Sequence, residues 1–511
     1  MRNKLLIACK SLTSGGVETY LKTQCSVFTK LGWDITVFVC GDFNEDFFKD
    51  LMKVKVIKGE GVPTTSIEII NFYNQIFAIV KGSEARFIVH SYSEELTFPL
   101  LMLCSKWNLP LINSFHSTSY FLEFHGPFYD FLYYSLTFSN LSLSLVLSEE
   151  MEEFLQPYVR SGSCLLIRNP ILRPDNLLKE KLDFDVRKIL IVSRLDKDKI
   201  LGIKEGISRV SNFFPKSVFL IAGEGDSKEE LRQSLFDLEE ENRLQFLGLI
   251  TNSKYDLMTK SDLVIGMGRV ALEAMSVGTP VLLIGYKDVK GLIDPVLFHE
   301  AAKSNFSGRN LPAVSNEDLK SQLSHLHQKE YVTDLQKLVK ESYDAEVIWT
   351  KIEHIFQEIN ADFPHKDLFN ALYKILKSYP SDRNILEDLD FIKNFEKLLS
   401  SLNLHDKRLQ ESFIFASNVY KDEKIVKLEQ IDFYHKRDER LIKESLARVI
   451  KEKEYLNELV ESYKKELEKI KLEFETKQRE ENSFLLNIIF LSIKRKIGKI
   501  LMDFSKGKNE K

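Results

Sequence analysis

Cations and a carboxylate follow apolar segments of this 511-residue chain, at points where buried strands would end. Arg194 and Lys199 come directly after the apolar run 188–192, and Glu273 follows the apolar run 262–265 after a glycine turn. An arginine fork and a lysine point charge together are typical of a diphosphate clamp. A carboxylate accepts hydrogen bonds from hydroxyl groups. Phosphates plus hydroxyls describe a nucleotide sugar, and the alternative for 193–199 is a solvated charged loop.

Three tight glycine turns accompany these side chains. Glycine lets the backbone approach a ligand closely, and a helix that begins at such a turn offers free N–H groups to an anion. Ser14 or Thr13 is expected to cap the helix after the first turn. The alternative is that the glycines serve only packing. The turn residues are Gly15 and Gly16; Gly223, Glu224 and Gly225; and Gly266, Met267 and Gly268.

The elements that must position these residues alternate between apolar strands and amphipathic helices. Continuous apolar strands separated by helices predict parallel sheets covered on both faces. Asn169–Pro170 and Pro174 mark a linker, so we predict one α/β domain over 1–165 and a second over 166–358, closing with helices that end near Gln357. A ligand would bind in the cleft between them, beyond the strand ends. The expected strands are 4–9, 34–40, 87–90, 111–115, 143–147, 188–192, 218–222, 244–247, 263–265 and 281–284, and a helix is expected over 228–238.

Composition excludes some classes of protein. The net charge of −4 gives no sign of nucleic-acid binding. The five cysteines show no paired spacing, which favours buried free thiols in a reducing compartment and makes a metal site unexpected. The apolar run 5–8 turns polar too soon for a signal peptide, and no apolar stretch approaches the ~20 residues of a transmembrane helix.

The last 150 residues differ from the rest. We expect a helical region over 359–440. From Ile442 to Phe474 apolar residues recur every three or four positions, which predicts a coiled coil over 441–482 and a homo-oligomer, with a single long helix as the alternative. Residues 483–511 combine isoleucines with lysines; 484–504 are typical of a basic amphipathic helix on an anionic membrane, with a packed helix end as the alternative.

The order and spacing of the motifs resemble the retaining glycosyltransferases of the "group 1" family, glycosyltransferase family 4, over residues 1 to about 358. The resemblance implies the GT-B architecture: two Rossmann-like doubly wound domains facing a cleft, here followed by the helical and coiled-coil extension. The motifs that carry it are Gly15-Gly16-Val17-Glu18, Asn169-Pro170, Ser193-Arg194-Leu195 with Lys199, Gly223-Glu224-Gly225, Phe246-Leu247-Gly248, and Leu272-Glu273-Ala274-Met275 with Gly278-Thr279-Pro280-Val281.

The resemblance also implies roles for individual residues. Arg194 and Lys199 would bind the donor diphosphate, Glu273 the ribose hydroxyls, and Gly16 would lie against the phosphates or the sugar. His116 resembles the family's cleft histidine beside the donor sugar, with a structural loop residue as the alternative. One departure stands out: the family's first glutamate falls at Ile265 here, so backbone N–H groups of 266–268 would contact the sugar instead.

The leading hypothesis is therefore a metal-independent hexosyltransferase that retains the anomeric configuration and needs no cofactor beyond its nucleotide-diphosphate sugar. The acceptor would be a hydroxyl of a cell-envelope or lipid-linked glycan, in the cytoplasm or at the inner face of the membrane. Because the first glutamate is absent, the alternative is a catalytically weak subunit that tethers a partner enzyme or the membrane. A nucleotide-sugar epimerase on the same fold is a third hypothesis.

Overall fold

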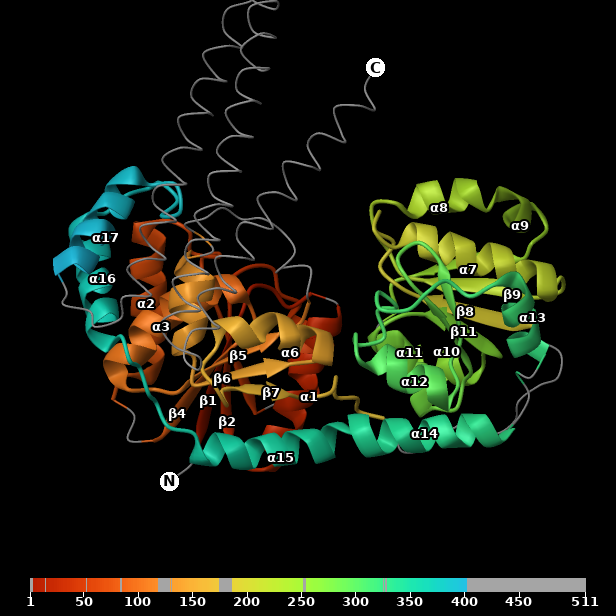
Figure 1. Ribbon diagram of the computed structural model, residues 1–511, viewed down its shortest axis with the longest axis horizontal. Coiled ribbons are helices and arrows are strands. Elements are labelled where there is room, and N and C mark those ends of the chain that lie inside the picture. The colour runs from red at the N-terminus through yellow and green to blue at the C-terminus, as the bar shows by residue number, and fades with distance from the viewer. Residues whose placement is uncertain are drawn as a thin grey trace, which may run out of the picture.

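The computed structural model describes residues 3–401, except 14, 52, 83–84, 118–128, 130, 174–185, 251–253, 325 and 327–328. The predicted coiled coil (441–482) and basic helix (483–511) lie outside the described residues, as does the helical region after 401. None of the helices within the described part is long and apolar enough to cross a membrane. The described residues form two α/β domains placed side by side (Figure 1).

The first domain is built on a seven-stranded sheet in the order β3-β2-β1-β4-β5-β6-β7, parallel throughout. Its strands are β1 (Lys4–Cys9), β2 (Asp34–Val39), β3 (Val54–Lys58), β4 (Phe87–Ser91), β5 (Leu111–Phe115), β6 (Leu143–Val146) and β7 (Cys164–Leu166). Its helices and helical turns are α1 (Gly16–Lys30), η1 (Glu45–Phe48), α2 (Ser66–Val80), α3 (Glu94–Trp107), η2 (Phe131–Thr137), η3 (Phe138–Asn140), α6 (Glu149–Leu155) and η4 (Gln156–Tyr158).

The second domain has a six-stranded sheet in the order β10-β9-β8-β11-β12-β13, in which only the edge pair β12–β13 is antiparallel. Its strands are β8 (Lys188–Val192), β9 (Val218–Ala222), β10 (Leu244–Gly248), β11 (Leu263–Gly266), β12 (Val281–Ile284) and β13 (Val289–Leu292). Its helices are α7 (Ile200–Phe213), α8 (Lys228–Ser234), α9 (Phe236–Glu240), α10 (Lys254–Thr259), α11 (Arg269–Ser276), α12 (Pro295–Ala302), α13 (Asn316–Ser324) and α14 (Lys329–Tyr343).

Both sheets carry helices on both faces, as the continuous apolar strands predict. Side chains that point to opposite faces of one strand belong to different cores: Leu6 and Ala8 of β1 pack with α2 and α3, whereas Leu5 and Ile7 pack with α1. The predicted pair of doubly wound domains is thereby confirmed. The cysteines are free as predicted: Cys9, Cys25, Cys40 and Cys104 are buried, and Cys164 is half-buried.

Three strands and one helix differ from the sequence-based expectation. Sequence reasoning missed β3, β7 and β13, three short strands at the edges of the sheets. Lysines interrupt the apolar runs of β3 and β13, and β7 has only three residues. The helix expected over 228–238 is instead α8 and α9, with a break at Leu235, whose side chain is buried.

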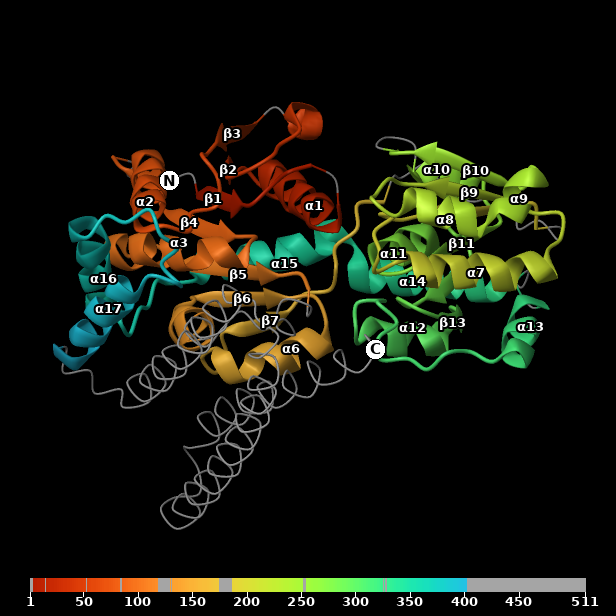
Figure 2. The same cartoon turned by 90° about the horizontal axis from the view of Figure 1, so that it is seen from above.

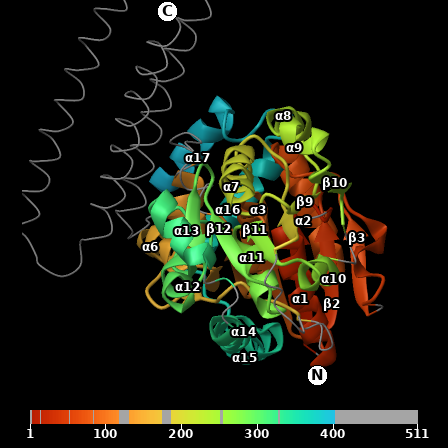
Figure 3. The same cartoon turned by 90° about the vertical axis from the view of Figure 1, so that its right-hand side faces the viewer.

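The chain returns to the first domain after completing the second. Helix α14 packs against α11 of the second domain, whereas the next helix, α15 (Ala345–Glu358), packs against α1 of the first. Figures 1 and 3 show the two helices end to end along one side of the molecule. Trp349 of α15 is fully buried in the first domain's core, where its Nε1 donates to Thr23 Oγ1 at 2.8 Å. The expectation that the helices ending near Gln357 close the second domain is therefore wrong for α15.

The predicted helical region begins with α16 (Lys366–Ser378) and α17 (Leu389–Ser401), which also belong to the first domain in space. Helix α16 packs against α2 and α3, and both helices bury their apolar faces in that core. Figure 2 shows this pair at the end of the molecule farthest from the second domain. The first domain is therefore made of two separated stretches of chain.

Candidate functional site

A cleft of about 1380 Å³ lies between the two domains, at the carboxyl ends of the strands. This is the position that open α/β sheets use for ligands. All eleven predicted site residues line this one cleft: Gly15, Gly16, His116, Arg194, Lys199, Gly223, Glu224, Gly266, Met267, Gly268 and Glu273.

The two predicted phosphate-binding cations occupy the loop between β8 and α7. Arg194 is 63% exposed and forms an ion pair with Asp196 at 3.1 Å. Lys199 stands at the start of α7, and within the described residues its ammonium group has no ion pair. Burial, and then the like charge of Arg194, lower the pKa of Lys199 below its usual range. Two cations that repel each other at the carboxyl end of a strand favour the binding of an anion. The anion would offset both the burial of Lys199 and its repulsion by Arg194.

The Gly223–Glu224–Gly225 turn supports that cationic loop. A Cβ atom at Gly223 would lie 1.8 Å from the Ser193 carbonyl oxygen, and one at Gly225 would lie 2.5 Å from the Leu195 carbonyl carbon. The N–H of Leu195 donates to the Glu224 carbonyl at 2.9 Å. The close approach of two backbones thus explains both glycines. The Glu224 carboxylate forms an ion pair at 2.8 Å with Lys228, the first residue of α8.

The Gly266–Met267–Gly268 turn leads from β11 into α11. Gly268 has φ +60°, a conformation that side chains other than glycine rarely adopt. Its N–H donates to the carbonyl of Phe306 at 2.7 Å, so this group is already engaged. The expectation that backbone N–H groups of 266–268 replace the missing glutamate is therefore wrong for Gly268.

Glu273 lies at the floor of the cleft with its side chain 2% exposed. Its Oε1 accepts from Lys254 Nζ and from Arg269 Nε, both at 2.8 Å. Burial raises the pKa of this carboxyl group, but Lys254 and Arg269 outweigh burial and bring the pKa below its usual range. The group is a carboxylate at neutral pH, as a hydroxyl acceptor must be.

Sequence reasoning missed Lys254 and Arg269. Arg269 precedes Glu273 by one helical turn, so the i,i+4 spacing was a usable signal. Lys254 comes from the separate helix α10, and no local pattern connects it to Glu273.

Helix α1 begins at Gly16, at the tip of β1. Gly15 is its N-cap, in an extended conformation, and among the described residues no side chain caps the helix, so Thr13 does not do so; Ser14 lies outside the described residues. Apart from its chain neighbours and its own helix backbone, no described residue has an atom within 4 Å of a Cβ atom placed at Gly16. Neither packing nor backbone geometry therefore requires glycine at this point of the cleft.

His116 follows β5 and lies among aromatic rings. Its ring packs edge-on against Tyr20 at 4.8 Å and stacks with Tyr92 at 5.4 Å. Burial lowers its pKa to about 3. Its Nε2 has no hydrogen-bond partner within the described residues. The ring lines the cleft and is neutral at physiological pH, and its low pKa makes it a poor proton acceptor, so these properties favour binding over the predicted catalytic role.

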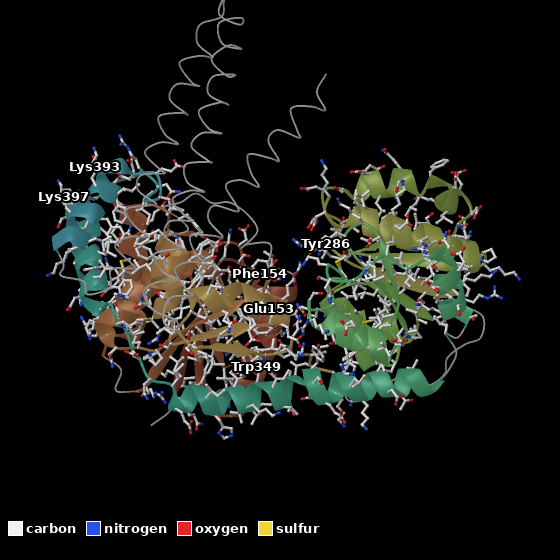
Figure 4. The ribbon with its side chains drawn as sticks, viewed as in Figure 1. Glu153, Phe154, Tyr286, Trp349, Lys393 and Lys397 are labelled. Carbon is white, nitrogen blue, oxygen red and sulfur yellow. The ribbon has the colours of Figure 1, made fainter. Side chains whose placement is uncertain are left out.

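The wall of the cleft formed by the first domain carries charged residues that no sequence motif predicted. Lys22 of α1 pairs with Asp50 at 2.8 Å and lies over the Phe47 ring at 5.4 Å. At the opposite edge an ion pair joins the domains: Arg309 donates to Glu150 at 2.8 Å. Figure 4 shows Tyr286 on the edge of the second domain that faces α6, where Glu153 and Phe154 lie. Some of these residues lie on helices α1 and α6 and others, such as Arg309, in irregular segments, and no local motif of the sequence brings them together.

Comparison with known proteins identifies a family model for part of the second domain and solved structures with the same fold. Residues 174–295, which include all six strands of the second sheet, match the family model described as "Glycosyl transferases group 1". This span therefore contains a group 1 glycosyltransferase domain. No curated protein sequence matches the chain.

Solved structures share the two-domain arrangement. Anabaena HepE in complex with UDP is similar with a TM-score of 0.51 and 17% identity, over 70% of this chain and all of HepE. A Rickettsia africae glycosyltransferase gives 0.54 and 18% over 70% and 99% of the two chains. The lipopolysaccharide outer core galactosyltransferase WaaB gives 0.51 and 14% over 70% and 100%. At such identities the likeness shows the fold, and the predicted GT-B architecture is confirmed.

Proposed function

We propose that this protein transfers a sugar from a nucleotide-diphosphate sugar to a hydroxyl group of a glycan acceptor. The observation that carries the proposal is that Arg194 and Lys199 line the same cleft as the ionised Glu273. Arg194 and Lys199 would bind a diphosphate, and Glu273 would accept hydrogen bonds from ribose hydroxyls. The group 1 domain over 174–295 and the UDP that HepE binds support a nucleotide sugar as the ligand.

In the proposed reaction the bond between the sugar's anomeric carbon and the diphosphate oxygen breaks, and the oxygen keeps the electron pair. The acceptor oxygen bonds to the same face of the anomeric carbon, which retains its configuration. The acceptor's proton passes to the departing diphosphate. Negative charge grows on the diphosphate as the bond breaks, and the fixed charges of Arg194 and Lys199 stabilise that charge. No protein nucleophile, cofactor or metal takes part in this scheme.

The remaining site residues bind and orient the donor. Glu273 accepts hydrogen bonds from the ribose, and the open space beside Gly16 receives the phosphates or the sugar. The ring of His116, which lines the cleft, contacts the sugar as a neutral group.

The proposed acceptor is a cell-envelope or lipid-linked glycan at the inner face of the membrane. The basic, isoleucine-rich segment 484–504 would hold the enzyme at that surface, and the heptads of 442–474 would make it an oligomer. WaaB, which shares the fold, is a lipopolysaccharide galactosyltransferase, which agrees with this class of acceptor.

A second candidate function is a catalytically weak subunit that tethers a partner. Ile265 stands where the resemblance expects a carboxylate that contacts the donor sugar, and the Gly268 N–H, expected in its place, already donates to the Phe306 carbonyl. Under this hypothesis the protein binds a nucleotide sugar weakly or not at all.

Calorimetric titration of the purified full-length protein with a panel of nucleotide-diphosphate sugars separates the two functions. For the transferase we expect saturable binding of one donor, lost in Glu273→Ala, and strongly reduced turnover in Arg194→Ala and Lys199→Ala. Lys197→Ala is the matched control, because Lys197 is an exposed cation of the same loop that does not line the cleft. A folded protein that binds no donor, or full turnover in both cleft variants, would remove the proposed donor site.

A further inference from the structure

Arg269 links the donor-side carboxylate to the linker between the domains. Its guanidinium group is buried, donating from Nε to Glu273 Oε1 at 2.8 Å and from Nη1 to Asn169 Oδ1 at 2.9 Å. Asn169 is itself buried, in the linker that follows β7. One side chain therefore touches both the floor of the cleft and the chain that crosses between the domains.

The linker is fixed at several further points on the second domain. The N–H of Ile171 donates to the Tyr343 carbonyl at 2.8 Å, and the N–H of Ala345 donates to the Ile171 carbonyl at 3.0 Å. The hydroxyl of Tyr255, next to Lys254 in α10, donates to the Leu172 carbonyl at 3.0 Å. The two crossings of the chain between the domains thus lie side by side, and Arg269 holds Glu273 against one of them.

The burial of Glu273 sets an electrostatic requirement. A carboxylate so deeply buried is stable only when cations or hydrogen-bond donors face it. The groups that face it are Arg269 from its own helix, and Lys254 and Tyr255 from α10. Both cations contact Oε1, and Oε2 takes part in neither contact. The ion pairs therefore orient the carboxylate while sparing one of its oxygens.

We propose that Arg269 is a positioning residue: it keeps the Glu273 carboxylate ionised, turns its second oxygen toward the ribose of the donor, and anchors it to the inter-domain linker through Asn169. The ribose contact rests on the proposed function; the ionisation of Glu273 does not. Arg269 touches no reacting atom and acts through Glu273. It compensates in part for the carboxylate that Ile265 replaces, because it gives the remaining one a fixed orientation.

The decisive variant is Arg269→Met, which keeps much of the side-chain volume and removes the charge. Without Arg269, Lys254 alone of the two cations still faces the buried carboxyl group, so the pKa of Glu273 rises relative to that in the wild type. Donor affinity in Arg269→Met should then fall as the pH is lowered from 8 to 5.5, by up to about tenfold per pH unit once the carboxyl group protonates. The wild type should show no such inflection. Arg269→Lys, which restores the charge, should restore the flat profile.

A second readout needs no ligand. In the wild type the lowered pKa of Glu273 stabilises the fold above the unfolded pKa, and this contribution is lost as the pH falls through the folded pKa. In Arg269→Met the pKa of Glu273 is higher than in the wild type, so less of this contribution is present, and the loss of thermal stability relative to wild type should be larger at pH 8 than at pH 5. Arg209→Met is the matched control, since Arg209 is a partly buried arginine of the same domain that bonds the Val314 carbonyl and lies outside the cleft.

The two readouts distinguish failure of this inference from failure of the proposed function. If the wild type binds no donor but the stability loss of Arg269→Met grows with pH, the transferase proposal fails and the role of Arg269 in ionising Glu273 stands. A stability loss that is the same at pH 5 and pH 8, with parallel affinity profiles where a donor binds, would overturn the proposal and leave Arg269 a structural ion pair.

Discussion

Replacing Gly16 with alanine should move stability and donor affinity in opposite directions. Gly16 is the first residue of α1, and apart from its chain neighbours and helix backbone no described residue lies within 4 Å of a methyl group placed there. Because glycine loses more conformational entropy on folding than alanine, the variant should gain about 0.5 kcal/mol in free energy of unfolding. A site that only served the fold would therefore prefer alanine.

The same methyl group would occupy the space that we assign to the donor's phosphates or sugar. Forcing an extra methyl group into a packed contact typically costs ~1–3 kcal/mol, which corresponds to roughly 5- to 150-fold weaker binding. Urea unfolding measures the first effect and calorimetric titration with the donor measures the second. The cost should fall on affinity rather than on the folded protein.

The control is Ser26→Ala, in the same helix but away from the cleft. It should also raise helix stability, by up to about 0.5 kcal/mol, without changing donor affinity. A Gly16→Ala protein that is more stable and binds the donor as tightly as the wild type would refute the idea that a ligand lies against Gly16. A less stable variant would show that the geometry of the turn is misjudged.

Two further predictions concern the first domain. Because the pKa of His116 is about 3, neither donor affinity nor turnover should show a His116 inflection between pH 5 and 8; an inflection in pH–rate profiles that disappears in His116→Gln would contradict this. Trp349→Ala should cost ~3–5 kcal/mol in urea unfolding, because it empties a site ringed by Tyr20 and Phe28, whereas Trp349→Phe should cost less; a loss below about 1 kcal/mol for the alanine variant would mean that α15 does not stabilise the first domain.

The central strands and the cleft residues could be predicted from the sequence because their signals are local. Strands such as β1 and β11 are unbroken apolar runs, and the residues of the site follow the strand ends directly. An edge strand such as β3 has no fully buried residue and contains two exposed lysines, so it lacks the unbroken apolar run of the central strands. Local signals therefore locate the interior of each sheet better than its edges.

The remaining features depend on contacts between distant segments. The periodicity of an amphipathic helix such as α15 predicts a buried face, but it does not predict which sheet that face covers. The ion pair of Lys254 with Glu273 joins two helices, and the bond of Arg269 to Asn169 joins residues 100 positions apart. Such contacts appear only when the path of the chain is known.

The return of α15 and α16 to the first domain has a consequence for how the protein is synthesised. The second domain is a continuous stretch, so its core can close as soon as its last helix, α14, is made. The first domain is interrupted: Trp349 and Phe356 complete one of its cores, and Leu368, Leu372 and Phe395 complete the other. At translation rates of about 5 to 20 residues per second, the ~190 residues between β7 and the end of α15 take roughly 10 to 40 s to emerge. During that time the cores of the first domain lack the side chains of α15, α16 and α17, and part of their apolar surface is uncovered. Of the two domains, the one that is synthesised first is therefore the last to finish folding.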